Sequence, residues 1–233
     1  MIIAHKIIIY LVLASCITHG FLHAMVSLKE AKKQYAPASA NLQETIKALR
    51  NYYEAPMDGQ ESAYERELRA ICQKALDEHF KEKKVTPKSA IVFDIDETLL
   101  TDYKFFKECN FEWTIEDAYQ YRFKKECSAI RPMQNFYNQL KALGYTLILL
   151  TSRREALYQV TQENLTKEGY VFDTLILLPM DLFNQHVSHG AWKASMRKTL
   201  SQHYDIVGCV GDSPSDFEGD CCGVQVRLPN YLY

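Results

Sequence analysis

Three short apolar runs stand out in the second half of the chain, and each one ends in polar residues. They cover residues 90–93, 145–150 and 206–210. Runs of this length without a polar face are typical of strands buried on both faces of a parallel sheet. Segments with helical periodicity lie between them. The alternation therefore predicts an α/β fold, a doubly wound parallel sheet of Rossmann type with flanking helices and right-handed crossovers.

The first half of the chain has a different pattern. Apolar residues recur at spacings of three and four over much of residues 28–84, which predicts helices, and residues 56–60 interrupt them. We therefore expect an N-terminal helical arm over residues 25–88 and the α/β core over residues 89–233. Within the core, residues 101–130 are predicted to form a small cap insertion.

The first 24 residues look like a targeting segment. Lys6 precedes an apolar run over residues 7–14, followed by small residues, which is the anatomy of a secretory signal peptide and too short to span a bilayer. Two interpretations of its processing stay open: a bacterial lipoprotein signal, in which Cys16 carries the lipid, or ordinary cleavage after Gly20 or Ala24. A further interpretation is that this segment is a buried N-terminal helix of the fold, but its lack of polar periodicity argues against this. We predict an exported protein, which is periplasmic, secreted or an outer-membrane lipoprotein anchored only at Cys16.

Charge and cysteine content bear on the possible partners of the chain and on its possible disulfides. The chain has 27 Lys and Arg against 29 Asp and Glu, a formal net charge of −2, and a pI near 6.4. This balance gives no electrostatic case for nucleic acid as a partner. Export would leave six cysteines besides Cys16, an even number that permits disulfides. Cys109 and Cys127 flank the aromatic part of the insertion and are candidates for a bridge, whereas Cys209 is expected to be a buried strand residue.

Two carboxylates, Asp94 and Asp96, follow the first apolar run at a spacing of two. A calcium-binding loop is excluded, because Thr98 and Leu99 stand where such a loop needs Asn or Asp and then Gly. Neighbouring buried carboxylates repel each other and are rarely placed together without a metal ion or a shared proton. Ligands bind at the carboxyl ends of parallel strands. This stretch therefore predicts a functional site.

Polar groups follow the other two apolar runs as well. Thr151 and Ser152 end the second run, and Asp212 ends the third, with Asp216 four residues later. Ser152 has capping-box spacing to a glutamate, which predicts a helix start there, and free backbone N–H groups at such a start are a natural phosphate cradle. Lys193 lies near the start of another predicted helix, where it is either a solvated residue or a phosphate-binding lysine.

These four parts, in this order, resemble the motifs of haloacid dehalogenase (HAD)-type phosphohydrolases. They read Asp-Ile-Asp-Glu-Thr-Leu-Leu from residue 94, Leu-Leu-Thr-Ser-Arg from 149, Trp-Lys-Ala-Ser from 192 and Gly-Asp-Ser-Pro-Ser-Asp from 211. The insertion and the C-terminal Leu-Pro-Asn-Tyr look like the acid phosphatase branch, subfamily IIIB, that includes bacterial class C and plant secreted acid phosphatases. The likeness covers residue 51 to the C-terminus. Arg131 departs from the class C pattern.

The resemblance implies a HAD-like fold and a role for each polar residue. Asp94 would attack phosphorus and form an aspartyl-phosphate, while Asp96 would act as the general acid and base. The residues implied to bind the phosphoryl group are Thr151, Ser152 and Lys193. The implied metal ligands are Asp94, the carbonyl of Asp96, and Asp212, and the residue that supports them from close by is Asp216.

The net charge of this site argues for a cation. Four aspartates and one lysine carry −4 + 1 = −3 when all are ionised, and a phosphate dianion cannot join them without a divalent cation and a proton on one carboxylate. Mg²⁺ fits because it favours carboxylate oxygens, water and phosphate. We therefore predict an exported, Mg²⁺-dependent acid phosphatase that hydrolyses small-molecule phosphomonoesters.

Two questions of function stay open. The alternative to an enzyme is a non-catalytic storage or binding protein on the same fold, although retention of the nucleophile with its partners favours catalysis. The aromatic residues of the insertion either stack on nucleoside monophosphates or aryl phosphates, or form the core of the cap itself. These residues are Tyr103, Phe105, Phe106, Phe111 and Trp113.

Overall fold

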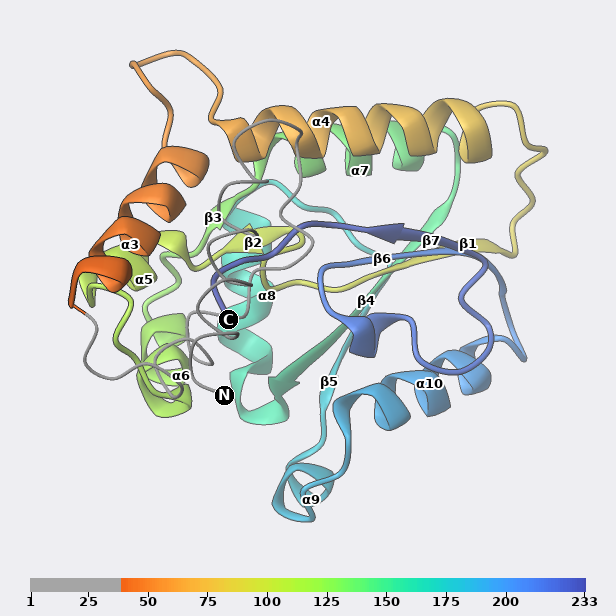
Figure 1. Cartoon of the computed structure of the whole chain (residues 1–233). Coiled ribbons are helices and arrows are strands. Elements are labelled where there is room, and N and C mark those ends of the chain that lie inside the picture. Colours follow the sequence, from red (N-terminus) through yellow and green to blue (C-terminus); the bar gives the residue numbers. More distant parts are fainter. Residues whose placement is uncertain (1–38) are drawn as a thin grey trace, which may run out of the picture. The chain divides into compact units, whose positions relative to one another are not determined.

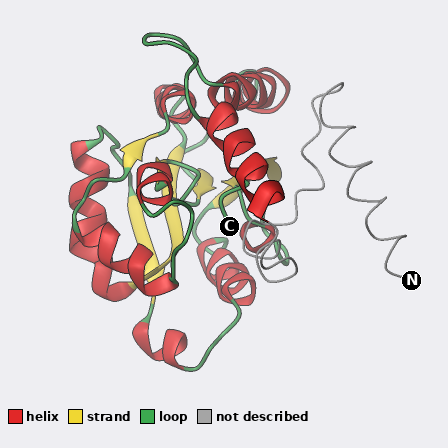
Figure 2. Cartoon of the chain, turned by 60° about the vertical axis from the view of Figure 1, so that its left-hand side comes forward, coloured by secondary structure: helices red, strands yellow, loops and turns green. Residues whose placement is uncertain are grey.

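The computed structural model describes residues 39–233. The predicted signal segment with Cys16, residues 1–24, and the predicted arm as far as residue 38 lie outside the described residues. The chain divides into two units, and residues 48–230 form one of them. This unit holds the sheet, with helices on both sides of its strands (Figure 2).

A five-stranded parallel sheet forms the centre of the unit, in the order β5-β4-β1-β6-β7 (Figure 1). Its strands are β1 (Ser89–Phe93), β4 (Thr146–Arg154), β5 (Thr174–Leu178), β6 (Asp205–Gly211) and β7 (Val224–Arg227). The three predicted apolar runs are the three central strands, which confirms the α/β prediction. All five residues of β1 are buried, as a strand covered on both faces requires.

The path of the chain places a ligand-binding edge beside β1. From β1 the chain moves outward to β4 and β5, and it then returns to β6 and β7 on the other side. In sheets of this kind ligands bind where the strand order reverses, at the carboxyl ends. Phe93, the last residue of β1, pairs with Leu149 of β4 and Val210 of β6. The residues that follow these three therefore gather at one edge.

Helices cover both faces of the sheet (Figure 1). One face carries α7 (Arg131–Ala142) and α8 (Tyr158–Lys167), and the other carries α9 (Met180–Asn184) and α10 (His189–Leu200). Successive residues of β1 supply the two cores, as strand geometry requires. Phe93 faces α7, where the ring centroid of Phe136 lies 6.3 Å away, and Val92 packs in the cluster that contains Trp192 of α10.

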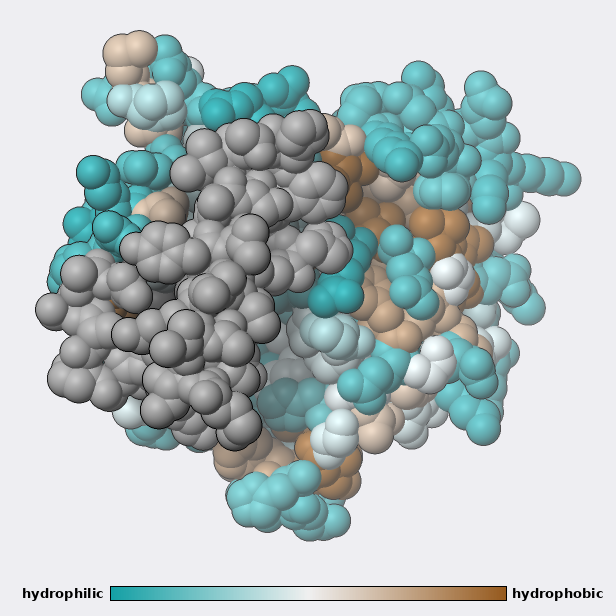
Figure 3. Space-filling model, in the orientation of Figure 1, coloured by the Kyte–Doolittle hydropathy of each residue, from teal (hydrophilic) through white to brown (hydrophobic). Residues whose placement is uncertain are grey.

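The helices predicted for the first half are confirmed where the structure describes them. They are α3 (Ser39–Tyr53) and α4 (Ala63–Ala75), and a π-helical turn, Leu76–Phe80, continues α4. The predicted interruption lies between α3 and α4. A capping box starts α4: the Ser62 hydroxyl accepts the Glu65 N–H at 3.1 Å, and the Glu65 carboxylate accepts the Ser62 N–H at 2.9 Å. Where α4 is visible in Figure 3 its surface is hydrophilic, while its buried side packs against α7.

Residues 101–130 leave and rejoin the core through a two-stranded antiparallel ribbon. Its strands are β2 (Leu100–Thr101) and β3 (Ser128–Ala129), and between them lie α5 (Tyr103–Glu108) and α6 (Ile115–Phe123). Phe105, Phe106 and Phe111 are buried, and the Trp113 ring meets Phe106 edge-on at 5.2 Å between centroids. These rings pack on one another, which favours the interpretation that they are the core of the insertion.

One local prediction is wrong. The helix start expected at Ser152 is absent, because β4 continues to Arg154, which still pairs with Leu178 of β5, and a 3₁₀ turn (Glu155–Leu157) then leads into α8. The candidate bridge between Cys109 and Cys127, which the sequence left open, is not formed, and both residues are free thiols. Burial of Cys209 is confirmed. Among the helices of residues 39–233, none has the length and apolarity that crossing a bilayer requires.

Candidate active site

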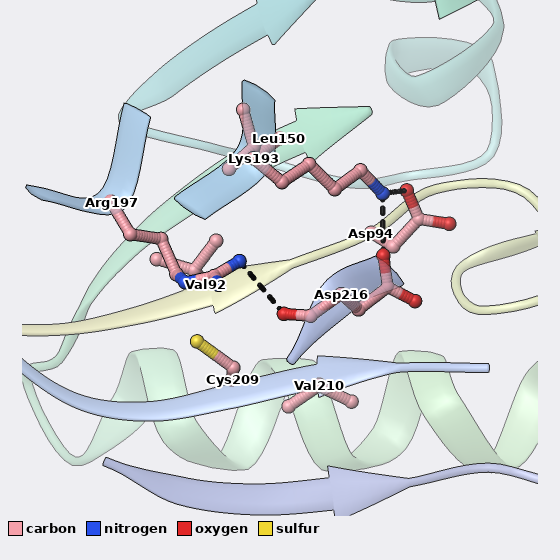
Figure 4. A pocket seen from close by; sticks show the side chains of 8 residues that line it. All are labelled: Val92, Asp94, Leu150, Lys193, Arg197, Cys209, Val210 and Asp216. Carbon is pink, nitrogen blue, oxygen red and sulfur yellow. Dashed lines mark hydrogen bonds and ion pairs between the residues drawn. The ribbon is translucent and has the colours of Figure 1, made fainter. Parts of the chain in front are cut away.

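Asp94 follows β1 directly and lies at the carboxyl edge of the sheet. Its backbone N–H donates to the Val210 carbonyl at 2.9 Å, which extends the pairing of β1 with β6 by one residue. Its carboxylate Oδ1 accepts a hydrogen bond from Nζ of Lys193 at 2.6 Å. Lys193 extends from α10 to Asp94 and is only 3% exposed (Figure 4). It is therefore not a solvated helix residue.

Two further carboxylates come from the end of β6 and the turn after it. Asp216 belongs to the 3₁₀ turn Pro214–Asp216, and its Oδ1 accepts a second hydrogen bond from Lys193 Nζ at 2.5 Å. Asp212 accepts hydrogen bonds from the Thr98 hydroxyl at 3.2 Å and from the Asn230 amide at 2.7 Å. These contacts fix the direction in which the two carboxylates point.

The carboxylates of Asp94, Asp212 and Asp216 form one buried cluster. One carboxylate oxygen from each of the three lies within 4.8 Å of the corresponding oxygens of the other two. With Lys193 alone against them, the cluster carries −3 + 1 = −2 when all groups are ionised. Buried carboxylate oxygens with an excess of negative charge suit a hard divalent cation. The three aspartates can therefore hold a divalent metal ion.

The pKa values report the same excess of negative charge. Burial raises the pKa of Asp94 well above its ordinary value, with Asp216 and Asp212 adding to the rise and Lys193 opposing it. Burial, reinforced by Asp216, raises the pKa of Asp212 to about 6. Burial alone would lower the pKa of Lys193, but the carboxylates of Asp94 and Asp216 outweigh it and raise that pKa. A bound cation would relieve this repulsion.

Asp96 lies on the turn after β1, and its carboxylate faces two arginines rather than the lysine. Arg153 donates to its Oδ1 from Nη2 at 2.7 Å and from Nε at 3.1 Å. Arg122 of α6 places Nη2 at 3.4 Å from the same oxygen. Burial raises the pKa of Asp96, but the charges of Arg122 and Arg153 outweigh this and leave the pKa below its ordinary value. The two arginines therefore favour the ionised form of Asp96.

Thr151 and Ser152 lie on β4 beyond the level at which β1 ends. The Thr151 hydroxyl is buried and accepts the Arg153 N–H at 3.2 Å, so its own proton remains available to donate. Ser152 is half-buried. β4 continues past both residues, so a helix does not begin here. An anion on this side of the edge would meet hydroxyl groups on a strand instead.

The residues predicted for the site all lie at this edge, although their partners were only partly foreseen. Asp216 lies in the carboxylate cluster itself, where a supporting position had been expected. The contacts not foreseen are those of Thr98, Arg122, Arg153 and Asn230. For Arg153 a signal existed, because it directly follows two hydroxyl residues at the end of a strand. For Arg122 there was none, since the face that α6 turns to the site depends on tertiary packing.

Comparison with solved structures supports the fold. The described architecture resembles the class C acid phosphatase from Bacillus anthracis with tungstate bound, with a TM-score of 0.62. The likeness covers 81% of this chain and 86% of that chain, at 20% sequence identity.

Curated relatives come from plants. The chain is 34% identical to the Stem 28 kDa glycoprotein of Glycine max over 163 residues, 66% of this chain and 63% of that protein. It is 28% identical to Vegetative storage protein 2 of Arabidopsis thaliana, over 73% of this chain and 66% of that protein. It is 29% identical to Acid phosphatase 1 of Solanum lycopersicum, over 61% of this chain and 57% of that protein. The chain thus spans less than two thirds of the length of these relatives.

A sequence model of a single family covers nearly the whole chain. It describes the HAD superfamily, subfamily IIIB (acid phosphatase), and it matches residues 22–233, which include every residue of the candidate site. The matched fold, the strand-end aspartates and the buried lysine agree with the motifs of the sequence. The chain belongs to the acid phosphatase family of the HAD superfamily, subfamily IIIB.

Proposed function

We propose that this protein is an acid phosphatase that hydrolyses phosphomonoesters through an aspartyl-phosphate on Asp94. The observation that carries the proposal is the hydrogen bond of 2.6 Å between Lys193 and Asp94 inside a buried carboxylate cluster at the strand ends. A buried cation next to a buried nucleophile is the arrangement that draws in a phosphate and neutralises it during attack.

In the first step Oδ2 of Asp94 attacks phosphorus, since Lys193 holds Oδ1 and Oδ2 faces away from the lysine (Figure 4). The ester P–O bond breaks, and its electron pair stays on the leaving oxygen, which takes a proton from Asp96. Lys193 and the hydroxyls of Thr151 and Ser152 stabilise the phosphoryl oxygens. In the second step water attacks phosphorus, Asp96 takes its proton, and the P–O bond to Asp94 breaks to release inorganic phosphate.

The surroundings of Asp96 fit the second step directly, because Arg122 and Arg153 lower its pKa and so favour the ionised form, which can accept a proton. The first step requires the protonated acid. A phosphomonoester that binds as the monoanion brings the missing proton with it, and the negative charge of the bound phosphate favours its transfer to Asp96. The need for a monoanionic substrate is a physical reason for activity at acid pH.

We further propose Mg²⁺ as the metal, held by Asp94, Asp212 and the carbonyl of Asp96, with Asp216 beside them. When bound, the ion supplies charge neutralisation for the phosphate and for the developing transition state. The oxygen-only donor set of the cluster supports this choice over softer metals.

The decisive experiment measures p-nitrophenyl phosphate hydrolysis by the purified chain with and without Mg²⁺. We expect turnover that depends on a divalent cation and is lost in Asp94→Asn, since a neutral amide cannot form the aspartyl-phosphate. Asp181→Asn, on α9 outside the site, serves as the matched control and should keep the parent rate. Activity of Asp94→Asn within tenfold of the parent would remove the nucleophile assignment.

The second candidate function is storage or binding without catalysis. The specific observation in its favour is the similarity to a protein named Vegetative storage protein 2. The same assay separates the two: a folded chain that hydrolyses no phosphomonoester at any pH from 4 to 8, with or without Mg²⁺, would favour storage.

Export and substrate preference belong to the proposal as well. We propose that residues 1–24 direct export and that the mature chain is secreted, periplasmic or anchored through Cys16. N-terminal sequencing of the mature protein tests this. We propose nucleoside monophosphates as candidate substrates alongside simple phosphomonoesters. Stacking of a base on Phe105, Phe106 or Phe111 is not part of this proposal, because these three rings are buried.

A further inference from the structure

Asp96 and four neighbouring side chains form a closed ring of polar contacts, which we call the Asp96 ring. Asp96 contacts Arg153 at 2.7 Å, and Arg153 lies 3.9 Å from the thiol of Cys127. The thiol donates to Asp102 at 3.0 Å, Asp102 accepts from Arg122 at 2.7 Å, and Arg122 returns to Asp96 at 3.4 Å. Two arginines and two aspartates balance, so the ring is neutral.

We propose that Arg153 and Arg122 are positioning residues, which hold the carboxylate of Asp96 at the angle and distance needed for proton transfer to the leaving group. The inference rests on the proposed function, because it assigns a task to Asp96 in that reaction. It goes further in making the insertion, through Arg122, part of the machinery for proton transfer.

Arg153 has the geometry of a fixed clamp. Its side chain is 0% exposed, and it approaches Asp96 with both Nε and Nη2. Its remaining nitrogen, Nη1, donates to the Thr161 hydroxyl of α8 at 3.1 Å. A guanidinium bound at both ends cannot rotate, and a planar fork sets the orientation of a carboxylate in a way that a lysine does not.

Arg122 carries the second contact from the insertion. Its Nε and Nη2 both donate to Oδ2 of Asp102, at 3.0 and 2.7 Å. Asp102 is fixed in turn by the Cys127 thiol, and these two residues lie at the two ends of the insertion. Because the side chain of Arg122 is 19% exposed, it can be replaced at less risk to folding than Arg153.

A purely structural role for the ring makes a different prediction from a positioning role. If the arginines only stabilised the fold, their loss would lower the amount of active protein and reduce turnover of every substrate alike. If they position Asp96, their loss weakens proton transfer alone. Poor leaving groups such as alkoxides depend on that proton, whereas p-nitrophenolate departs without it.

The test compares Arg153→Lys with the parent on p-nitrophenyl phosphate and on glycerol phosphate. Arg154→Lys is the matched control, because Arg154 follows on the same strand and stacks on Tyr119 and Phe183 instead of contacting Asp96. We expect Arg153→Lys to lower kcat for glycerol phosphate about 10- to 100-fold and kcat for p-nitrophenyl phosphate less than about threefold, with KM unchanged. The control should match the parent on both substrates.

A double variant sharpens the result. In an Asp96→Asn background, Arg153→Lys should cause no further fall in kcat for glycerol phosphate, because Arg153 acts through Asp96. Circular dichroism and the melting temperature verify folding. If Arg153→Lys does not fold, Arg122→Lys replaces it in the test. We expect Arg122→Lys also to lower kcat more for glycerol phosphate than for p-nitrophenyl phosphate, but by a smaller factor.

The outcomes separate the two levels of the proposal. An active parent whose folded arginine variant keeps both rates, or loses both equally, overturns the positioning role and leaves the phosphatase assignment intact. A parent that hydrolyses neither substrate overturns the proposed function and the positioning role together.

Discussion

At the scale of single residues, the site residues that directly follow a buried strand could be predicted from the sequence. Asp94 and Asp212 were predicted because a parallel sheet brings its carboxyl ends together. The direction of each side chain was not predictable. Asp94 contacts Lys193, whereas Asp96 contacts Arg153, and this difference depends on where each strand ends. In particular, β4 continues to Arg154 through residues whose pattern predicts the start of a helix.

The glycine that ends β6 gives a prediction at this scale. A Cβ at Gly211 would lie 2.2 Å from Oδ2 of Asp216, and that carboxylate is already bound by Lys193. We expect Gly211→Ala to displace Asp216 and to lower kcat more than about tenfold, since ångström-scale misplacement in an active site can cost 10²-fold. Steady-state kinetics on p-nitrophenyl phosphate measures it.

Gly208 on the same strand provides the matched comparison. Its added Cβ would meet the Phe80 ring at 2.9 Å, away from the site. Gly208→Ala should therefore cost about 1–3 kcal/mol of unfolding free energy by overpacking, with kcat kept per folded molecule. A Gly211→Ala variant that retains the parent kcat would show that Asp216 tolerates displacement.

At the scale of elements, the three central strands were predicted, and the two edge strands were not. β1, β4 and β6 are apolar runs, whereas β7 alternates Val224, Gln225, Val226 and Arg227 at the edge of the sheet and gives only a weak signal. β5 is an apolar run of the same kind and was accessible to the same reasoning. The extent of β4 was not, because its pairing with β5 outweighs the capping pattern at Ser152.

The packing of the insertion gives a prediction at this scale. Trp113 contacts Phe106, which is 1% exposed. We expect Trp113→Ala to lower the melting temperature and to reduce kcat/KM for a nucleoside monophosphate and for glycerol phosphate by the same factor, because the ring supports the insertion and not a base.

The control is Phe123→Ala, an aromatic residue on α6 that is 40% exposed, which should leave the melting temperature nearly unchanged. Loss confined to the nucleotide in Trp113→Ala would instead assign stacking on the substrate to this residue.

At the scale of the whole molecule, topology converts distant positions into one site. Residues 94, 151, 193 and 212 meet because β1, β4 and β6 are adjacent and α10 crosses back over them. The alternation of elements predicted a parallel, doubly wound sheet, but it did not give the order of the strands. The division of the chain into units could not be predicted either, because it depends on contacts between segments far apart in the sequence.

The metal links this site to the stability of the whole molecule. Without a cation, one carboxylate oxygen from each of Asp94, Asp212 and Asp216 lies within 4.8 Å of those of the other two, with one lysine between them. A cation that binds only the folded chain stabilises it by about 2.7 kcal/mol at 100 times its Kd. For a chain of this size that corresponds to a rise in Tm of roughly 5–10 °C. We expect this rise when Mg²⁺ is added to the EDTA-treated protein at constant ionic strength, measured by differential scanning calorimetry.

Asp212→Asn should lose most of the rise in Tm, because a carboxylate ligand becomes an uncharged amide while the Thr98 and Asn230 contacts keep the side chain in place. Asp205→Asn is the matched control, since Asp205 is an exposed aspartate at the opposite end of the same strand and should keep the full rise. If Asp212→Asn and the parent respond equally to Mg²⁺, the ion binds elsewhere, and the carboxylate cluster must balance its charge through protons alone. Activity would then persist in EDTA, which the same samples can be used to measure.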